Sequence, residues 1–223
     1  MKIKICGLTK PQEAAYLNEV HAAYAGFVFY EKSKRNITIQ RAREIVQQLD
    51  PGIQRVAVMV SPDEQMIEQL EEAQLFDILQ IHGTLSAQVL KKASLPIWYA
   101  VNVADEEEIA RQEAVLAQFG EAADAIRAIV VDGAKYGGGK VFNWRKSRRL
   151  LKAGAQSPPD MGLFAGGREF VLAGGLQAEN VAEGILLFAP DVVDVSSGVE
   201  GPDGKDREKI LAFAKAAEAT ERA

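Results

Sequence analysis

Two side chains of this sequence, Cys6 and Asp132, have the types and placement of an acid–base pair. Cys6 is the one cysteine of the chain and ends an apolar run, residues 2–6, at the turn Gly7-Leu8-Thr9. Asp132 lies near the end of a second apolar run, residues 128–133. A carboxyl group can protonate a leaving oxygen while a thiolate removes a proton from carbon, without a metal or a redox cofactor. Two simpler readings stay open: a lone cysteine is often a small buried apolar residue, and Asp132 could cap its own loop.

Two stretches late in the chain have the residue types of a phosphate site. Gly174 and Gly175 form the first stretch, and Ser196, Ser197 and Gly198 form the second. Glycines let the backbone approach an anion, and exposed N–H groups and hydroxyls can donate to phosphate oxygens. The alternative is that these glycines only make tight turns between strands and helices.

Further polar side chains stand at or just after the ends of apolar runs. Arg35 belongs to a basic loop, residues 31–36, that directly follows such a run, although a solvated loop would look the same. Gln80 and His82 are two positions apart in another run and therefore share one face of a strand. We expect His82 to line a site rather than to act as a catalyst.

The residue types argue against a metal or a bound cofactor. One cysteine and two histidines without ligand spacing make a poor metal site. His21 is most simply a surface residue of a helix. We therefore expect no cofactor and no metal.

Composition limits the class of protein. The 223 residues are 48% apolar, which can build a sizeable core, and the net charge of −5 argues against nucleic acid or an anionic membrane as partner. A single cysteine permits no internal disulfide, which suits a reducing cytoplasm. No window approaches the roughly 18 apolar residues of a membrane span. We expect a cytoplasmic protein that acts on a small molecule, as a monomer or possible homodimer.

Eight apolar runs alternate with about eight helical segments, without a linker. We expect the strands at residues 2–6, 24–30, 55–60, 78–83, 96–103, 128–133, 170–175 and 191–195. Alternating strands and helices imply parallel strands. Eight such units in this length favour one closed α/β domain over residues 1–223, a (β/α)8 TIM barrel with parallel strands.

Local patterns predict where several helices begin. Thr9 has the spacing of a capping box with Gln12, and Thr38 precedes an amphipathic segment. Ser61, followed by a proline, has the pattern of an N-cap. The last helix is expected to begin near Asp206.

A closed barrel would bring the separated polar residues to one rim. All C-terminal strand ends of a parallel barrel lie on the same side, and the loops after strands seven and eight commonly bind phosphate there. Cys6 and Asp132, on strands one and six, would face each other across the mouth. Lys4 shares the inward face with Cys6 and could form a buried ion pair with Asp194 on the neighbouring strand, which is weak evidence of stability.

Motifs from residue 2 to about residue 214 resemble those of the phosphoribosylanthranilate isomerases. They are Lys4 to Thr9, Gly26 to Tyr30 with Lys32 to Arg35, Gln80 to Gly83, Asp132 with Tyr136 to Gly138, Ala173 to Leu176, and Asp194 to Glu200. The resemblance implies conversion of N-(5-phosphoribosyl)anthranilate to 1-(2-carboxyphenylamino)-1-deoxyribulose 5-phosphate by an Amadori rearrangement. It places the chain in tryptophan biosynthesis, with a phosphosugar as its small-molecule partner.

The resemblance also implies roles for individual residues. Asp132 matches the general acid that protonates the furanose ring oxygen, and Cys6 matches the general base that takes the C2 proton. Arg35 matches the residue that holds the anthranilate carboxylate, a bidentate task suited to a guanidinium. The residues matching the phosphate site are Gly174, Gly175, Ser196 and Ser197, and we expect Gly198, Gln80 and His82 to contact the substrate as well.

The sequence departs from the family pattern in three places. The loop 137–140 is one residue shorter than the usual Gly-Gly-Thr/Ser-Gly-Lys, and Asn143-Trp144 replaces Asp-Trp. Tyr99 and Asn102 stand in a strand that often carries a basic residue. These departures bear on loop closure and turnover rather than on the acid, the base or the phosphate groups.

Two other functions stay open. Indole-3-glycerol-phosphate synthase shares the phosphate loops, but its chemistry needs a catalytic lysine at a strand end, which no strand here obviously supplies on the rim. A non-catalytic phosphosugar-binding barrel would keep the pocket without turnover. The presence of both Cys6 and Asp132 argues against it.

Overall fold

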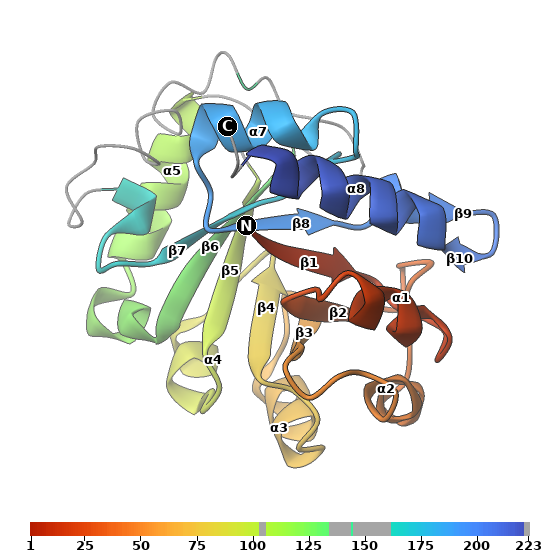
Figure 1. The fold of residues 1–223 in the computed structure, drawn as a ribbon. Coiled ribbons are helices and arrows are strands. Elements are labelled where there is room, and N and C mark those ends of the chain that lie inside the picture. The colour runs from red at the N-terminus through yellow and green to blue at the C-terminus, as the bar shows by residue number, and fades with distance from the viewer. Residues whose placement is uncertain (103–105, 134–143, 145–161, 221–223) are drawn as a thin grey trace.

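Eight parallel strands close into a barrel, with helices around the outside (Figure 1). This computed structural model describes residues 1–102, 106–133, 144 and 162–220. The first and last strands of the barrel, red and blue in Figure 1, are hydrogen-bonded neighbours. The predicted TIM barrel with parallel strands is confirmed.

The strands lie close to their predicted positions. They are β1 (Lys2–Cys6), β2 (Tyr24–Phe29), β3 (Gln54–Val60), β4 (Ile78–His82), β5 (Ile97–Asn102), β6 (Ile126–Asp132), β7 (Glu169–Leu172) and β8 (Val192–Val195). The largest difference is at β7, which ends at Leu172 instead of continuing to residue 175. Gly174 and Gly175 have left-handed backbone conformations, with φ of 82° and 71°, and therefore belong to the turn that follows.

The described α-helices connect these strands around the barrel. They are α1 (Glu13–Glu19), α2 (Ile39–Val46), α3 (Glu64–Glu72), α4 (Ala87–Lys92), α5 (Glu106–Ala117), α7 (Val181–Phe188) and α8 (Arg207–Ala219). A short hairpin, β9 (Glu200–Gly201) with β10 (Gly204–Lys205), lies between β8 and α8. Most of the segment between β6 and β7, residues 134–143 and 145–161, lies outside the described residues. None of the described helices is long and apolar enough to cross a membrane.

Alternation along the strands produces two buried layers. Ile3 and Ile5 of β1 belong to the layer between strands and helices, whereas Cys6 belongs to the layer inside the barrel. Tyr24 and Trp98 pack edge to face inside the barrel, with ring centroids 4.8 Å apart. The predicted inward position of Cys6 is thus confirmed, and Ile3 and Ile5 form the aliphatic outer face of β1.

Two predicted helix starts are confirmed, and a side chain caps each of them. The side chain of Thr38 accepts a hydrogen bond from the backbone N–H of Arg41 at the start of α2. The side chain of Asp206 accepts one from the N–H of Lys209 at the start of α8. Both contacts use an N–H group that the first turn of a helix leaves without an intrahelical partner.

Two other predicted helix starts are wrong. Gln12, not Thr9, precedes α1, and the Glu13 carboxylate accepts from the backbone N–H groups of Thr9 and Lys10 at 2.7 and 3.1 Å. The start of α1 therefore has no side-chain cap, and Glu13 instead binds the backbone of the loop before the helix. Helix α3 is capped by Asp63, because Ser61 has a left-handed backbone (φ 47°) and its hydroxyl accepts from the N–H of Thr84.

The departures from the family pattern are only partly described. Residues 137–140 and Asn143 lie outside the described residues. Trp144 is buried and packs edge-on against Phe188, with ring centroids 5.8 Å apart. Tyr99 is buried in the outer layer, and its hydroxyl donates to the carbonyl of Gly83 at 3.3 Å.

Candidate active site

A cavity of about 720 Å³ lies at the C-terminal ends of the barrel strands. Nine of the ten predicted site residues line it: Cys6, Arg35, Gln80, His82, Asp132, Gly174, Gly175, Ser196 and Ser197. They come from β1, β4 and β6 and from the loops after β2, β7 and β8. The volume suits a small-molecule ligand.

Gly198 is the predicted site residue that does not line this cavity. A Cβ atom at this position would collide with the backbone carbonyl of Leu176. The absence of a side chain at Gly198 therefore lets the loop after β8 pack directly on the loop after β7. Packing between the two loops accounts for the glycine, and its expected contact with a ligand stays a prediction.

Cys6 ends β1 and is 8% exposed. It pairs in register with Gly26 of β2, where a Cβ atom would lie 2.7 Å from the Cys6 Sγ atom. Burial raises the pKa of the Cys6 thiol, and the ammonium groups of Lys4 and Lys205 partly offset that effect. The thiol is thus buried in the cavity wall with two cations near it.

The predicted ion pair between Lys4 and Asp194 lies directly below Cys6. The Lys4 Nζ atom is 2.7 Å from Asp194 Oδ2, and the lysine is completely buried. Burial alone would lower the pKa of Lys4, but Asp194 raises it above the usual range. Asp194 also lines the cavity, and its second oxygen, Oδ1, has no hydrogen-bond partner among the described residues. This contribution to the cavity was missed in the sequence, although strand alternation indicated that Asp194 points inward.

Asp132 ends β6 on the cavity wall and is 9% exposed. Its Oδ1 atom accepts a hydrogen bond of 2.7 Å from the N–H of Gly133, so the alternative role as a cap of its own loop is present as well. A Cβ atom at Gly174 would lie 2.7 Å from the same oxygen. The glycine turn after β7 therefore lies against the carboxylate.

Gln80 and His82 contact each other on the wall formed by β4. The Nε2 atoms of the two side chains are 2.9 Å apart, and since an amide nitrogen only donates, the histidine nitrogen is the acceptor. Burial, helped by the positive charge of Lys4, lowers the pKa of His82 to about 3. His82 is therefore neutral at physiological pH and can line the site as a hydrogen-bonding group.

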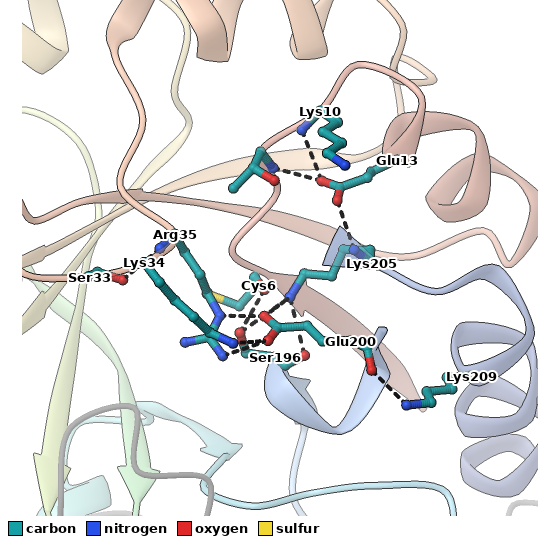
Figure 2. A network of polar contacts seen from close by, with 11 residues as sticks. Cys6, Lys10, Glu13, Ser33, Lys34, Arg35, Ser196, Glu200, Lys205 and Lys209 are labelled. Carbon is teal, nitrogen blue, oxygen red and sulfur yellow. Dashed lines mark hydrogen bonds and ion pairs between the residues drawn. The ribbon is translucent and has the colours of Figure 1, made fainter. Parts of the chain in front are cut away.

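Arg35 reaches the cavity from the loop after β2 and is paired with Glu200 of β9 (Figure 2). Its Nε and Nη2 atoms donate to the two carboxylate oxygens at 2.5 and 3.1 Å. Lys34 donates to the same carboxylate at 2.8 Å. A Cβ atom at Gly7 would collide with Cδ of Arg35, so the arginine side chain lies directly over this glycine.

Lys205 of β10 completes this network (Figure 2). Its side chain is 1% exposed, and its Nζ atom donates to Glu200 at 3.0 Å and to the carbonyl of Ser196 at 3.2 Å. The Ser196 hydroxyl in turn donates to the carbonyl of Cys6 at 2.9 Å. No local pattern in the sequence singled out Glu200 or Lys205, although Glu200 closes the last of the quoted motifs.

The cavity thus combines a thiol, the carboxyl groups of Asp132 and Asp194, and the cations of the loop after β2. Lys32, Lys34 and Arg35 lie on one side of the mouth. Within the described ranges, no group of three histidine, cysteine, aspartate or glutamate residues is placed to hold a metal ion. The arrangement can bind an anionic small molecule and move protons on it.

Comparison with known proteins gives a consistent result. A family model described as N-(5'phosphoribosyl)anthranilate (PRA) isomerase matches residues 3–216. The N-(5'-phosphoribosyl)anthranilate isomerase of Thermoanaerobacter pseudethanolicus is 33% identical over 218 residues, which cover 96% of each chain. The crystal structure of phosphoribosyl anthranilate isomerase from Thermotoga maritima has a TM-score of 0.81 and 31% identity, covering 98% of this chain and 99% of that one. A structure of such an isomerase in complex with reduced 1-(o-carboxyphenylamino)-1-deoxyribulose 5-phosphate has a TM-score of 0.78, 31% identity and the same coverage.

Proposed function

Because the chain belongs to the N-(5'-phosphoribosyl)anthranilate isomerase family, we propose that it converts N-(5'-phosphoribosyl)anthranilate to 1-(2-carboxyphenylamino)-1-deoxyribulose 5-phosphate in tryptophan biosynthesis. The observation that carries this proposal is the convergence of Cys6, Asp132, Arg35 and the glycine turn after β7 on one cavity. The relative that holds a reduced 1-(o-carboxyphenylamino)-1-deoxyribulose 5-phosphate supports a phosphosugar as the ligand class.

The reaction needs one proton donor and one proton acceptor. Asp132 donates a proton to the ring oxygen of the ribose, the bond between that oxygen and C1 breaks, and the nitrogen lone pair forms a Schiff base. Cys6 then removes the proton from C2, which gives an enolamine that tautomerises to the ketone. Strands β1 and β6 are separated by β7 and β8 in the closed barrel, which leaves room for a sugar between the two groups.

Charge around Cys6 supports its role as the base. A thiol must lose its proton to act, and burial opposes this by raising the pKa. The carboxylate of Asp194 raises the pKa as well, whereas the ammonium groups of Lys4 and Lys205 lower it. These ammonium groups stabilise the thiolate, the form of Cys6 that must be present before the proton can be taken from carbon.

The remaining cavity residues suit the ends of the substrate. Arg35 binds the carboxylate of the aromatic ring, and the turns containing Gly174, Gly175 and Ser197 bind the phosphate through backbone N–H groups and the hydroxyl. The left-handed glycines support this assignment because side chains are absent where the anion approaches. Gln80 Oε1 has no partner among the described residues and can accept a hydrogen bond from a sugar hydroxyl.

A direct assay tests the proposal. Purified protein is mixed with freshly generated N-(5'-phosphoribosyl)anthranilate, and loss of the fluorescence of this substrate is followed. We expect catalysed loss with formation of the ketose product. Binding without turnover would instead identify a non-catalytic phosphosugar-binding barrel. In a parallel reaction supplied with the ketose, its consumption with release of carbon dioxide would identify a synthase of the indole-3-glycerol-phosphate type.

A further inference from the structure

We propose that Glu200 is a positioning residue, which holds one edge of the Arg35 guanidinium and thereby presents the other edge to the carboxylate of the substrate. This inference rests on the proposed function, because it concerns how the same site recognises the anthranilate end. Glu200 itself does not line the cavity, whereas Arg35 does. The glutamate therefore acts through the arginine.

The contact between the two side chains fixes the plane of the guanidinium. Glu200 accepts from Nε of Arg35 through Oε1 and from Nη2 through Oε2, and two parallel hydrogen bonds of this kind define an orientation. A guanidinium has further N–H donors on Nη1 and Nη2. Nη1 has no hydrogen-bond partner among the described residues, so the edge formed by the two terminal nitrogens is available for a second carboxylate.

The arginine side chain is also confined along its length. It passes over Gly7, where any side chain would collide with its Cδ atom. The side chains of Arg35 and Glu200 are 13% and 12% exposed, so solvent has little access to the pair. Gly7 supports the stem and Glu200 holds the end, and both contacts come from outside the loop that carries Arg35.

The carboxylate that holds Arg35 is itself held by a hairpin. Glu200 of β9 is paired with Lys205 of β10 in the backbone, and their side chains form an ion pair of 3.0 Å. The backbone N–H of Lys205 donates to the buried Glu13 at 2.8 Å, and Lys209 donates to the carbonyl of Glu200 at 2.6 Å (Figure 2). The hairpin is thereby tied to both α1 and α8.

The charges around Glu200 favour a role in positioning Arg35 over one in neutralising its charge. Three cations, Lys34, Arg35 and Lys205, share the single carboxylate of Glu200. Burial alone would raise the pKa of Glu200, but hydrogen bonds from Arg35 and Lys34, together with Lys205, lower it to about 2. Glu200 is therefore ionised under all working conditions, and the cluster still has an excess of positive charge toward an anionic ligand.

The opposite role would be competition, in which Glu200 occupies Arg35 and the substrate carboxylate has to displace it. The two roles differ in sign. Removing the charge of Glu200 weakens binding of a carboxylate ligand if the residue positions Arg35, and strengthens it if the residue competes for Arg35.

Two stable ligands separate these possibilities. Reductive amination of ribose 5-phosphate with anthranilate or with aniline gives a matched pair of phosphosugar alcohols that differ only in the ring carboxylate. Calorimetric titration of the parent protein should show that the carboxylate ligand binds roughly ten- to a hundredfold more tightly. This ratio corresponds to the contribution of about 1.5–3 kcal/mol from a hydrogen bond to a charged group. Arg35→Ala should abolish this preference.

Glu200→Gln should lower the preference for the carboxylate ligand about tenfold, which removes most of it. The affinity for the aniline-derived ligand should change less than about twofold. The amide group still fills the space but presents N–H groups to the guanidinium. Glu200→Asp, which keeps the charge and withdraws it by one methylene group, should give an intermediate preference. In the Arg35→Ala background, Glu200→Gln should have no further effect on it.

Glu19→Gln is the matched control, because Glu19 pairs with the exposed Arg207 away from the cavity. It should change neither affinity.

An equal loss of affinity for both ligands in Glu200→Gln would indicate a merely structural role of Glu200. An increased preference for the carboxylate ligand would indicate competition for Arg35. Either result overturns the proposal. If Glu200→Gln does not fold, an unchanged preference for the carboxylate ligand in Glu200→Asp would also overturn the proposal. If the parent protein shows no preference, the assigned role of Arg35 fails and the positioning role fails with it, whereas a preference retained in Glu200→Gln removes only the positioning role.

Discussion

Cys6 and Gly26 are direct neighbours in the barrel, and the thiol occupies space that any side chain at Gly26 would take. The two residues pair in register between β1 and β2. A Cβ atom at Gly26 would lie 2.7 Å from Sγ and 3.1 Å from Cβ of Cys6. A glycine at this position is therefore needed for the observed placement of the proposed base.

Gly26→Ala tests whether that placement matters. The added methyl group must displace the thiol, so we expect kcat to fall by at least roughly tenfold while KM changes less, because misplacing a reacting group affects the transition state most. Gly52→Ala is the control, since a Cβ atom at Gly52 meets nothing within 4 Å. Parental kcat in a well-folded Gly26→Ala protein would contradict the proposed position of the base.

The acid and the base should each be required for turnover. Cys6→Ala and Asp132→Asn are each expected to lower kcat by at least about 10²-fold, with a much smaller change in KM, because both groups act in the transition state. Steady-state kinetics on the fluorescent substrate measures this. A Cys6→Ala enzyme with near-parental kcat would show that the thiol only fills space.

Alkylation of Cys6 should depend steeply on pH. Burial raises the pKa of this thiol above its ordinary value of 9.0, so the reactive thiolate is the minor form at neutral pH. We expect the rate of iodoacetamide inactivation to rise about tenfold per pH unit from about pH 7 to 9 without levelling. Lys205→Met removes a cation that lowers this pKa and should slow alkylation, whereas Lys92→Met, in an exposed pair with Glu68, should not. A plateau below about pH 8 would contradict the raised pKa.

Phosphate binding should depend on the turn after β7. Gly175→Asp places a negative charge in the proposed phosphate approach and should raise KM strongly, by repulsion of like charges. Gly175→Ala measures the cost of a side chain at this left-handed position (φ 71°), and Gly166→Asp repeats the charge change at a left-handed glycine with open space around it. Inorganic phosphate and sulfate should compete with the substrate for the parent protein. If neither anion competes at high concentration, the assignment of this turn as the phosphate site is wrong.

Glu200 should make stability depend on acid pH. Its pKa in the folded protein is about 2, below its ordinary value of 4.5, so its contribution to the free energy of unfolding is fully present above about pH 4.5 and is lost as the pH falls toward 2. Urea unfolding of the parent and of Glu200→Gln should therefore show the largest difference near neutral pH and a shrinking one below about pH 4.5. A difference that is constant with pH would show that Glu200 titrates normally.

The sequence by itself determined the fold and most of the cavity wall. The order of strands and helices predicts parallel pairing, and parallel pairing places all C-terminal strand ends on one rim, so Cys6, His82 and Asp132 were expected together. Local contacts were predictable in the same way. Thr38 and Asp206 cap their helices because an N-cap acts within three residues of itself.

Only the tertiary structure decided which side chains hold the site residues and their loops in place. Glu13, not Thr9, satisfies the N–H groups before α1 and also binds the backbone of Lys205, a residue 192 positions away. Glu200 contacts Arg35 across 165 positions. Neither contact has a local pattern, because the path of the hairpin after β8 depends on how β1 and β8 meet when the barrel closes. The strands follow from the alternation of side chains between neighbouring residues. Side-chain contacts between loops depend instead on the register of the whole barrel.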